Sequence, residues 1–190
     1  MNGVVGVLLA AGAARRFGAA KLLHPLPGGE AIGITAARAL IAALPDVVAV
    51  IRPGDQALHG GLDGLGLRVI ENPRAAEGIG TSIAAGVAAA PQASGWLIAL
   101  ADMPFIRPAT VAALADALRG GASIVAPQHA GRRGHPVGFA ARWREDLCTL
   151  DGDRGARGLI TAYAAALTLL PTDDPGVLRD VDRMEDLPTG

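Results

Sequence analysis

The sequence has one cysteine, six aromatic residues and almost no net charge. A lone Cys148 excludes an internal disulfide, and no cysteine or histidine pair has the spacing of a zinc site, so we expect a reducing, cytoplasmic location. The 17 basic residues nearly balance the 18 acidic ones, leaving a formal net charge of −1. Because aromatic side chains that could stack on bases are few and cations are not in excess, we expect no nucleic-acid binding.

A long apolar run is also lacking. The charge-free stretch at positions 3–14 is too short to cross a bilayer. No positive charge precedes it and Arg15-Arg16 follows it directly, which is unlike a secretory signal. We therefore expect neither membrane association nor export.

Small and aliphatic residues are abundant instead. The 190 residues include 39 alanines and 26 glycines, and 51% are hydrophobic, which suffices for one aliphatic core. No repeat or long linker is present, so we predict a single domain over residues 1–190. Apolar runs predict strands at 4–9, 47–51, 67–70, 96–101, 124–126, 137–139 and 167–170, and helical patterns occupy 31–44, 82–90, 108–118 and 154–165. This alternation predicts a three-layer α/β/α, Rossmann-like fold with a mostly parallel sheet.

A turn of small residues follows the first predicted strand, at the sheet edge where ligands bind in open parallel sheets. Counted from Gly12, the dinucleotide motif would need glycines where Ala14 and Phe17 stand. The Walker motif would need a glycine where Phe17 stands and a lysine where Gly18 stands. What remains is a loop whose backbone N–H groups can approach an anion, with Arg16 and Lys21 to neutralise its charge.

Carboxylates are expected at the same edge. Asp102 directly follows a buried strand, and one aspartate that faces a phosphate-binding loop suits Mg²⁺, which prefers one or two carboxylates plus phosphate oxygens and water. Asp180 and Asp182 are two residues apart, so on a short strand both side chains would point to one face.

A second cationic group is expected near position 153. Asp153 can cap the predicted helix whose first turns carry Arg154 and Arg157, three residues apart and so neighbours on one face. Two guanidinium groups beside a helix N-terminus could hold a phosphate of a second substrate.

Six segments, in order along positions 9–187, resemble the MobA-like nucleotidyltransferases. The first is L-A-A-G-A-A-R-R-F-G-A-A-K at 9–21. It is followed by E-N-P at 71–73 with G at 78 and S-I-A-A-G at 82–86, L-A-D-M-P at 100–104, G-H-P-V at 134–137, L-D-G-D-R-G-A-R at 150–157 and D-V-D-R-M-E-D-L at 180–187. The details favour the molybdenum-cofactor cytidylyltransferases, because guanylyl-transferring members usually have L-A-G-G and an aspartate before the lysine, where this chain has Ala11 and Ala20.

The resemblance implies a nucleotide-diphospho-sugar-transferase-like fold and Mg²⁺-dependent transfer of CMP from CTP to the phosphate of molybdopterin, with release of pyrophosphate. It also implies transient contact with a molybdoenzyme or its chaperone. Its catalytic residues would be Arg16, Lys21 and Asp102. The implied nucleotide-binding residues are Leu9, Ala10, Ala11, Gly12, Arg16, Lys21, Asn72, Gly78 and Ser82; the acceptor-binding residues are His135, Arg154 and Arg157. Asp102 would hold the metal together with Asp182 or Asp180, of which we favour Asp182.

Other functions remain open at this stage. Guanylyl transfer to the same acceptor, or cytidylyl transfer to another small phosphate, needs the same residues. Ala14 stands where the family usually has serine and Met184 where it usually has proline, which favours a non-catalytic cofactor-binding chaperone as an alternative. An NAD-dependent dehydrogenase is disfavoured by the absent glycine motif.

Overall fold

The computed structural model describes residues 3–12 and 20–187, and its strands form one eight-stranded sheet. The strand order is β3-β2-β1-β4-β7-β5-β6, and β8, which lies off this path, also pairs with β5. The strands are β1 (Val4–Leu9), β2 (Val47–Ile51), β3 (Arg68–Glu71), β4 (Gly95–Leu100), β5 (Ile124–His129), β6 (Arg132–Arg133), β7 (Val137–Ala140) and β8 (Leu167–Pro171). Strands β1 to β4 pair in parallel, as do β5 and β8, while β6 and β7 run antiparallel to their neighbours.

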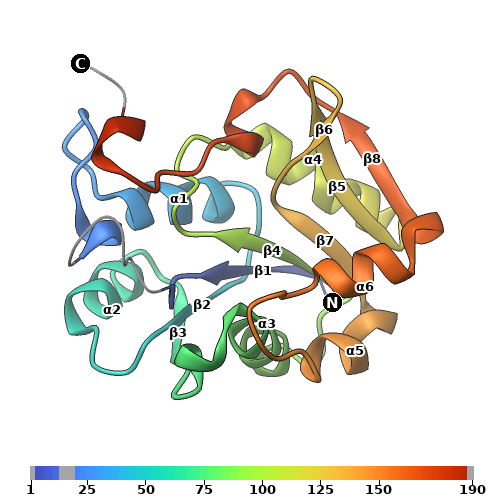
Figure 1. Cartoon of the computed structure of the whole chain (residues 1–190), viewed down its shortest axis with the longest axis horizontal. Helices are drawn as coiled ribbons and strands as arrows, with labels where there is room; N and C mark the ends of the chain where they lie inside the picture. The colour runs from blue at the N-terminus through green and yellow to red at the C-terminus, as the bar shows by residue number, and fades with distance from the viewer. Residues whose placement is uncertain (1–2, 13–19, 188–190) are drawn as a thin grey trace.

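Helices cover both faces of this sheet (Figure 1). They are α1 (Ile32–Ile41), α2 (Gln56–Asp63), α3 (Ile79–Ala89), α4 (Pro108–Arg119), α5 (Arg144–Cys148) and α6 (Arg157–Ala162). One hydrophobic cluster joins the sheet to α1, α2 and α4, and a second joins it to α3, α5 and α6. The predicted three-layer α/β/α fold with a mostly parallel sheet is thus confirmed.

Strand β1 shows why an uninterrupted apolar run lies at the centre. All six of its residues are buried, with Leu8 in the first cluster and Val7 in the second. Since successive side chains of a strand point to opposite faces, a strand covered on both sides must be apolar throughout. On the α3 side the packing is so close that a Cβ at Gly86 would overlap the Val7 side chain. The glycine lets helix and sheet approach each other.

The structure corrects two sequence-based predictions and adds two helices, α2 and α5. The helix predicted at 154–165 begins only at Arg157, because the chain takes positive φ at Gly152 and Gly155; Asp153 therefore does not cap it. Residues 180–182 form an irregular segment where we expected a strand. Helix α2, which the sequence analysis did not predict, begins after Asp55, whose side chain accepts a hydrogen bond from the Leu58 N–H.

The carboxyl ends of β1 and β4 and the C-terminal segment lie on the same side of the molecule (Figure 1). The Val181 N–H donates to the Asp102 carbonyl (2.9 Å), which attaches that segment to the end of β4. Within the described residues, none of the helices is long and apolar enough to span a membrane.

Candidate active site

Three charged side chains that are far apart in the sequence meet at this edge of the sheet. The Lys21 ammonium donates to Asp102 Oδ2 (2.9 Å) and to Asp182 Oδ1 (3.1 Å). The Lys21 side chain is 8% exposed, whereas those of Asp102 and Asp182 are 28% and 49% exposed. The cation is therefore enclosed, and the two carboxylates still reach solvent.

Main-chain hydrogen bonds fix the strand ends that carry this group. The Ala10 N–H donates to the Val50 carbonyl (2.8 Å) and the Ala101 N–H to the Leu9 carbonyl (3.1 Å). The hydrogen-bonding ladder therefore continues one residue past β1 and one residue past β4, so that Asp102 follows directly after this paired end of the sheet. Because the Ala10 N–H is engaged in the sheet, the described N–H groups that could face a phosphate are those of Ala11 and Gly12.

The path to Lys21 passes through an unusual backbone conformation. Ala20 has φ 64° and ψ 33°, in the left-handed region that non-glycine residues seldom adopt. Lys21 then begins a 3₁₀ turn, Lys21–Leu23. Left-handed geometry costs an alanine about 1–2 kcal/mol, so the surrounding contacts must hold the turn that sends Lys21 inward.

Lys21 is the only lysine of the sequence, among 17 basic residues. Burial alone would lower the pKa of its ammonium, but the hydrogen bonds and charges of Asp102 and Asp182 outweigh this, and the pKa is raised above its usual value. The amine is therefore a fixed positive charge at neutral pH and no base or nucleophile. An ammonium also contacts a carboxylate at a single point, so Lys21 can move away from its two carboxylates more readily than an arginine with a bidentate guanidinium could.

The pair of carboxylates around Lys21 fits a divalent cation. Asp102 and Asp182 converge on one point and are partly exposed, which leaves room for phosphate oxygens and water. Magnesium is usually held by one or two carboxylates and keeps several other oxygen ligands. Among the described residues no group of three or more acidic, histidine or cysteine side chains could hold a metal, so an all-protein cage is not present in that part of the chain.

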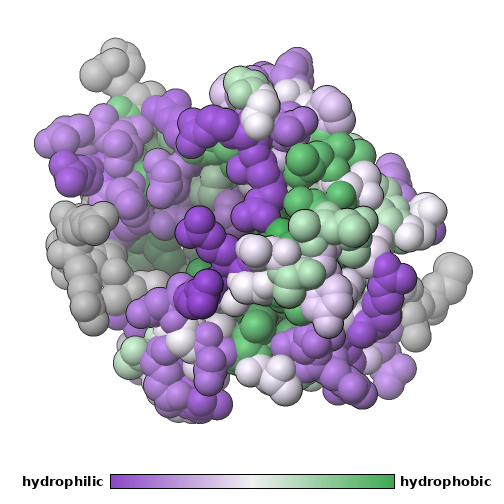
Figure 2. Space-filling view, turned by 45° about the vertical axis from the view of Figure 1, so that its right-hand side comes forward, coloured by the Kyte–Doolittle hydropathy of each residue, from purple (hydrophilic) through white to green (hydrophobic). Residues whose placement is uncertain are grey.

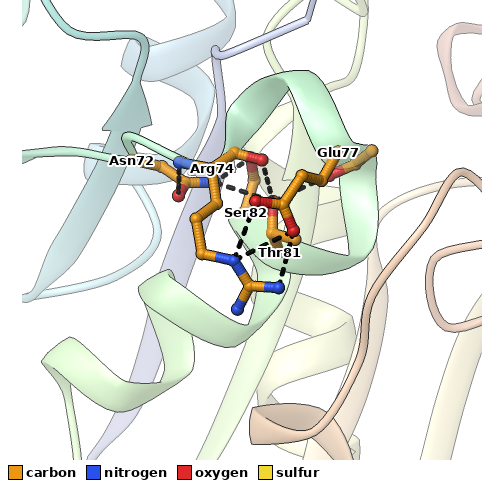
Figure 3. A network of polar contacts seen from close by, with 6 residues as sticks. Asn72, Arg74, Glu77, Thr81 and Ser82 are labelled. Carbon is orange, nitrogen blue, oxygen red and sulfur yellow. Dashed lines mark hydrogen bonds and ion pairs between the residues drawn. The ribbon is translucent and has the colours of Figure 1, made fainter.

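Asn72 and Ser82, both predicted to bind nucleotide, lie in one buried network (Figure 3). The Asn72 amide donates to Thr81 Oγ1 (2.9 Å) and Ser82 Oγ (3.0 Å), and its oxygen accepts from the Arg74 N–H (3.0 Å). Asn72, Thr81 and Ser82 are each 4% exposed. The network joins the loop after β3 to the first turn of α3, and so shapes the segment that contains Gly78.

That segment packs directly against residues 151–153. A Cβ at Gly78 would overlap the Gly152 carbonyl, and one at Gly80 would overlap the Asp151 backbone. The Gly80 N–H donates to the Gly152 carbonyl (2.9 Å). Only glycine permits this contact, which brings the predicted nucleotide-binding and acceptor-binding segments together.

A pocket of about 350 Å³ lies between this contact and the sheet. Its apolar walls come from β1, β4, β7, α3 and α6, and include Leu9, Ile83, Leu100, Val137, Phe139 and Ile160. Arg133, Arg154 and Arg157 line it as well, with Asp153 and His135. Figure 2 shows hydrophobic side chains in hollows of the surface, bordered by hydrophilic ones. A pocket of this size and lining suits a small organic anion.

His135 lines the pocket and lies within range of the charges of Asp102 and Asp180. Burial lowers the pKa of its imidazole, as does the charge of Arg133, while Asp102 and Asp180 oppose the shift. The ring is therefore neutral at pH 7. Its Nδ1 is buried and has no hydrogen-bond partner among the described residues, and its backbone N–H donates to the Val177 carbonyl (2.9 Å).

The structure thus brings together most of the residues that the sequence singled out. Arg16 lies outside the described residues. Asp180 is exposed and acts on His135 through its charge, whereas Asp182 contacts Lys21.

Sequence reasoning missed Arg133, although it directly precedes the G-H-P-V segment. It also missed the structural role of Asp186, whose carboxylate accepts from the Asp182 N–H.

The architecture is that of an α/β protein in which two carboxylates converge at one edge of the sheet, beside an arginine-lined pocket. Residues 6–167 match the MobA-like NTP transferase domain, and the chain belongs to that family.

Two relatives match nearly the whole chain. It is 33% identical to nicotine blue oxidoreductase from Paenarthrobacter nicotinovorans over 193 residues, covering 97% of this chain and 94% of the relative. It is 31% identical to the purine catabolism protein PucB of Bacillus subtilis over 199 residues, covering 96% and 93%.

A solved structure, Rv0371c from Mycobacterium tuberculosis, superposes with a TM-score of 0.84 at 24% identity, covering 97% of this chain and 95% of that one. Its complex with manganese superposes with a TM-score of 0.79 at 25% identity, covering 97% and 96%.

Proposed function

We propose that this protein transfers CMP from CTP to the phosphate of a molybdopterin-type acceptor, in a Mg²⁺-dependent reaction that releases pyrophosphate. The observation that carries the proposal is the convergence of Lys21, Asp102 and Asp182 beside the arginine-lined pocket. A triphosphate at the Gly12 loop and an acceptor in the pocket would meet between these two places.

The chemistry needs little from the protein beyond positioning and charge. An oxygen of the acceptor phosphate attacks the α-phosphorus of CTP, the bond from that phosphorus to the bridging oxygen breaks, and pyrophosphate leaves. Because the attacking phosphate is already ionised at neutral pH, no general base is required. Lys21 and Arg16 neutralise the charge of the triphosphate, and the N–H groups of Ala11 and Gly12 bind its oxygens.

Asp102 and Asp182 would hold Mg²⁺, which supplies charge neutralisation on the phosphate oxygens when bound. The manganese complex of the related Rv0371c supports a divalent-metal site in this fold. We favour Asp182 over Asp180 because Asp182 shares Lys21 with Asp102.

Arg154 and Arg157 would bind the acceptor phosphate at the pocket, with the neutral His135 beside the ring system. The loop around Gly78, held by Asn72 and Ser82, would lie against the base and ribose. The preference for CTP over GTP rests on Ala11 and Ala20, which differ from the usual guanylyl-transferring pattern.

The test is pyrophosphate release with purified molybdopterin, Mg²⁺ and each of the four NTPs in turn. We expect release with CTP, and at least a hundredfold slower release by Asp102→Asn, the usual effect of losing a charge stabiliser. Asp173→Asn is the matched control, because that carboxylate is 94% exposed and pairs only with Arg107 among the described residues. Release with GTP alone would make the protein a guanylyltransferase. CTP binding without release by any NTP would favour the chaperone alternative.

A second candidate is a redox activity, favoured by the 33% identity to a relative named nicotine blue oxidoreductase. Oxidation of NADH or NADPH in the presence of a dye acceptor tests it. We expect none, because the loop after β1 lacks the glycine pattern of dinucleotide sites.

A further inference from the structure

The C-terminal segment folds around the carboxylate of Asp186. Its Oδ2 accepts hydrogen bonds from the Asp182 N–H (2.8 Å) and from the Arg183 N–H (2.7 Å). The Asp186 carbonyl accepts one from the Arg179 guanidinium (2.9 Å). A single side chain and its own backbone thus close the segment 179–186 into one turn.

This turn is attached to the body of the protein just before Asp182, and it is closed within itself just after Asp182. Before it, the Val181 N–H donates to the Asp102 carbonyl, and the Arg179 guanidinium lies 4.2 Å from the centre of the Phe105 ring. After it, the Arg183 N–H donates to the Asp186 carboxylate of the same turn. The Cα position of Asp182 is therefore set relative to Asp102, although residues 180–182 belong to no strand or helix.

The two bonds at Asp186 are charge-assisted. The Asp182 and Arg183 N–H groups both donate to one carboxylate oxygen of Asp186, Oδ2. Hydrogen bonds to a carboxylate are shorter and stronger than those between neutral groups.

We propose that Asp186 is a positioning residue that fixes Asp182 against Asp102 and thereby sets the affinity of the site for a divalent cation. Asp186 does not itself touch the cation; it acts through the main chain of Asp182. The inference rests on the proposed role of Asp102 and Asp182 as metal ligands. Groups that orient metal ligands typically contribute 10–100-fold to metal affinity.

The test compares Asp186→Asn with Asp186→Ala in the full chain. Both native hydrogen bonds end on Oδ2, so an asparagine can still accept both with its amide oxygen, whereas alanine accepts neither. Mn²⁺ binding is measured by electron paramagnetic resonance without nucleotide. We expect Asp186→Asn to bind Mn²⁺ within about threefold of the unmodified protein, and Asp186→Ala to bind at least tenfold more weakly.

Two further measurements separate positioning from charge and from unfolding. Glu185→Ala is the matched control, because it removes one exposed negative charge from the same turn and should leave Mn²⁺ affinity unchanged. Hydrogen exchange should show that the amides of Asp182 and Arg183 lose protection in Asp186→Ala and keep it in Asp186→Asn. Circular dichroism and thermal melting report whether each variant remains folded.

Equal Mn²⁺ affinity of Asp186→Ala and the unmodified protein would overturn the proposal, as would equally weak binding by both Asp186 variants or no Mn²⁺ binding by the unmodified protein. The outcome does not depend on the reaction. If no NTP releases pyrophosphate but the Asn and Ala variants differ as expected, the proposed function is wrong and the role of Asp186 stands. If CTP is turned over and the two variants bind Mn²⁺ alike, the reverse holds.

Discussion

Replacement of Lys21 by methionine should have opposite effects on metal binding and on turnover. Methionine keeps an unbranched apolar stem of similar size and removes the charged amine. Lys21 now lies between the two carboxylates that would hold the metal, so it competes with a divalent cation for them. In the reaction, by contrast, the same charge is needed on the triphosphate.

The size of the effect follows from the two contacts. A hydrogen bond between charged groups contributes about 1.5–3 kcal/mol when it is well protected, and much less when solvent screens it. Asp102 is the better protected partner and Asp182 is half exposed, so we expect a total loss of about 2–3 kcal/mol. For a chain of this length that lowers the melting temperature by about 4–12 °C.

The loss of a competitor that contributes about 2 kcal/mol should strengthen Mn²⁺ binding by up to roughly 30-fold. Turnover should fall at least a hundredfold, or about 3 kcal/mol. Thermal melting across a Mn²⁺ titration measures the first effect and pyrophosphate release the second. Arg38→Met is the control, because the Arg38 and Glu30 side chains are 56% and 36% exposed and an exposed pair contributes less than about 1 kcal/mol. Weaker or unchanged Mn²⁺ binding by Lys21→Met would refute the competition.

Three further predictions test the site and its support. Asp182→Asn should weaken Mn²⁺ binding at least tenfold, whereas Asp180→Asn should change it less than threefold in the same titration; the opposite ranking would exchange their roles. Since the folded-state pKa of His135 lies below its ordinary 6.5, protonation favours unfolding, and the free energy of unfolding in urea should fall from pH 7.5 to 5.5, but less so in His135→Gln. Gly86→Ala should destabilise the fold by about 1–3 kcal/mol, because its Cβ would overlap Val7, whereas Gly60→Ala in helix α2 has free space and should stabilise by up to about 1 kcal/mol; chemical denaturation of both decides.

The sequence predicts the central strands well for a physical reason. Runs such as that of β1 must be buried on both faces, and few other structures accommodate them. Prediction from the sequence fails where the conformation of glycines and contacts between distant segments determine the backbone. The stretch from Arg154 onward has a helical pattern, but the close approach of Gly78 and Gly80 to residues 151–153 requires a turn there.

In the candidate site, too, some features follow from local sequence and others depend on tertiary contacts. That Lys21 and Asp102 lie near one edge of the sheet follows from their position after two buried strands. The meeting with Asp182, 161 residues after Lys21, depends on the return of the C-terminal segment over the end of β4, which no local pattern encodes. The spacing of Asp180 and Asp182 does not separate their roles, and the resemblance only favours Asp182; in the structure the turn closed by Asp186 brings Asp182 into contact with Lys21.

The presence of a single lysine makes the site selectively visible by isotope labelling. Because Lys21 is enclosed and holds its proton firmly, amine reagents would modify it poorly, but isotope-labelled lysine supplied during expression labels Lys21 and no other residue of this sequence. Its nuclear magnetic resonance signal would then report whether the cation rests on its two carboxylates or has moved to a bound phosphate. Without any mutation, the protein provides its own spectroscopic probe at the proposed catalytic centre.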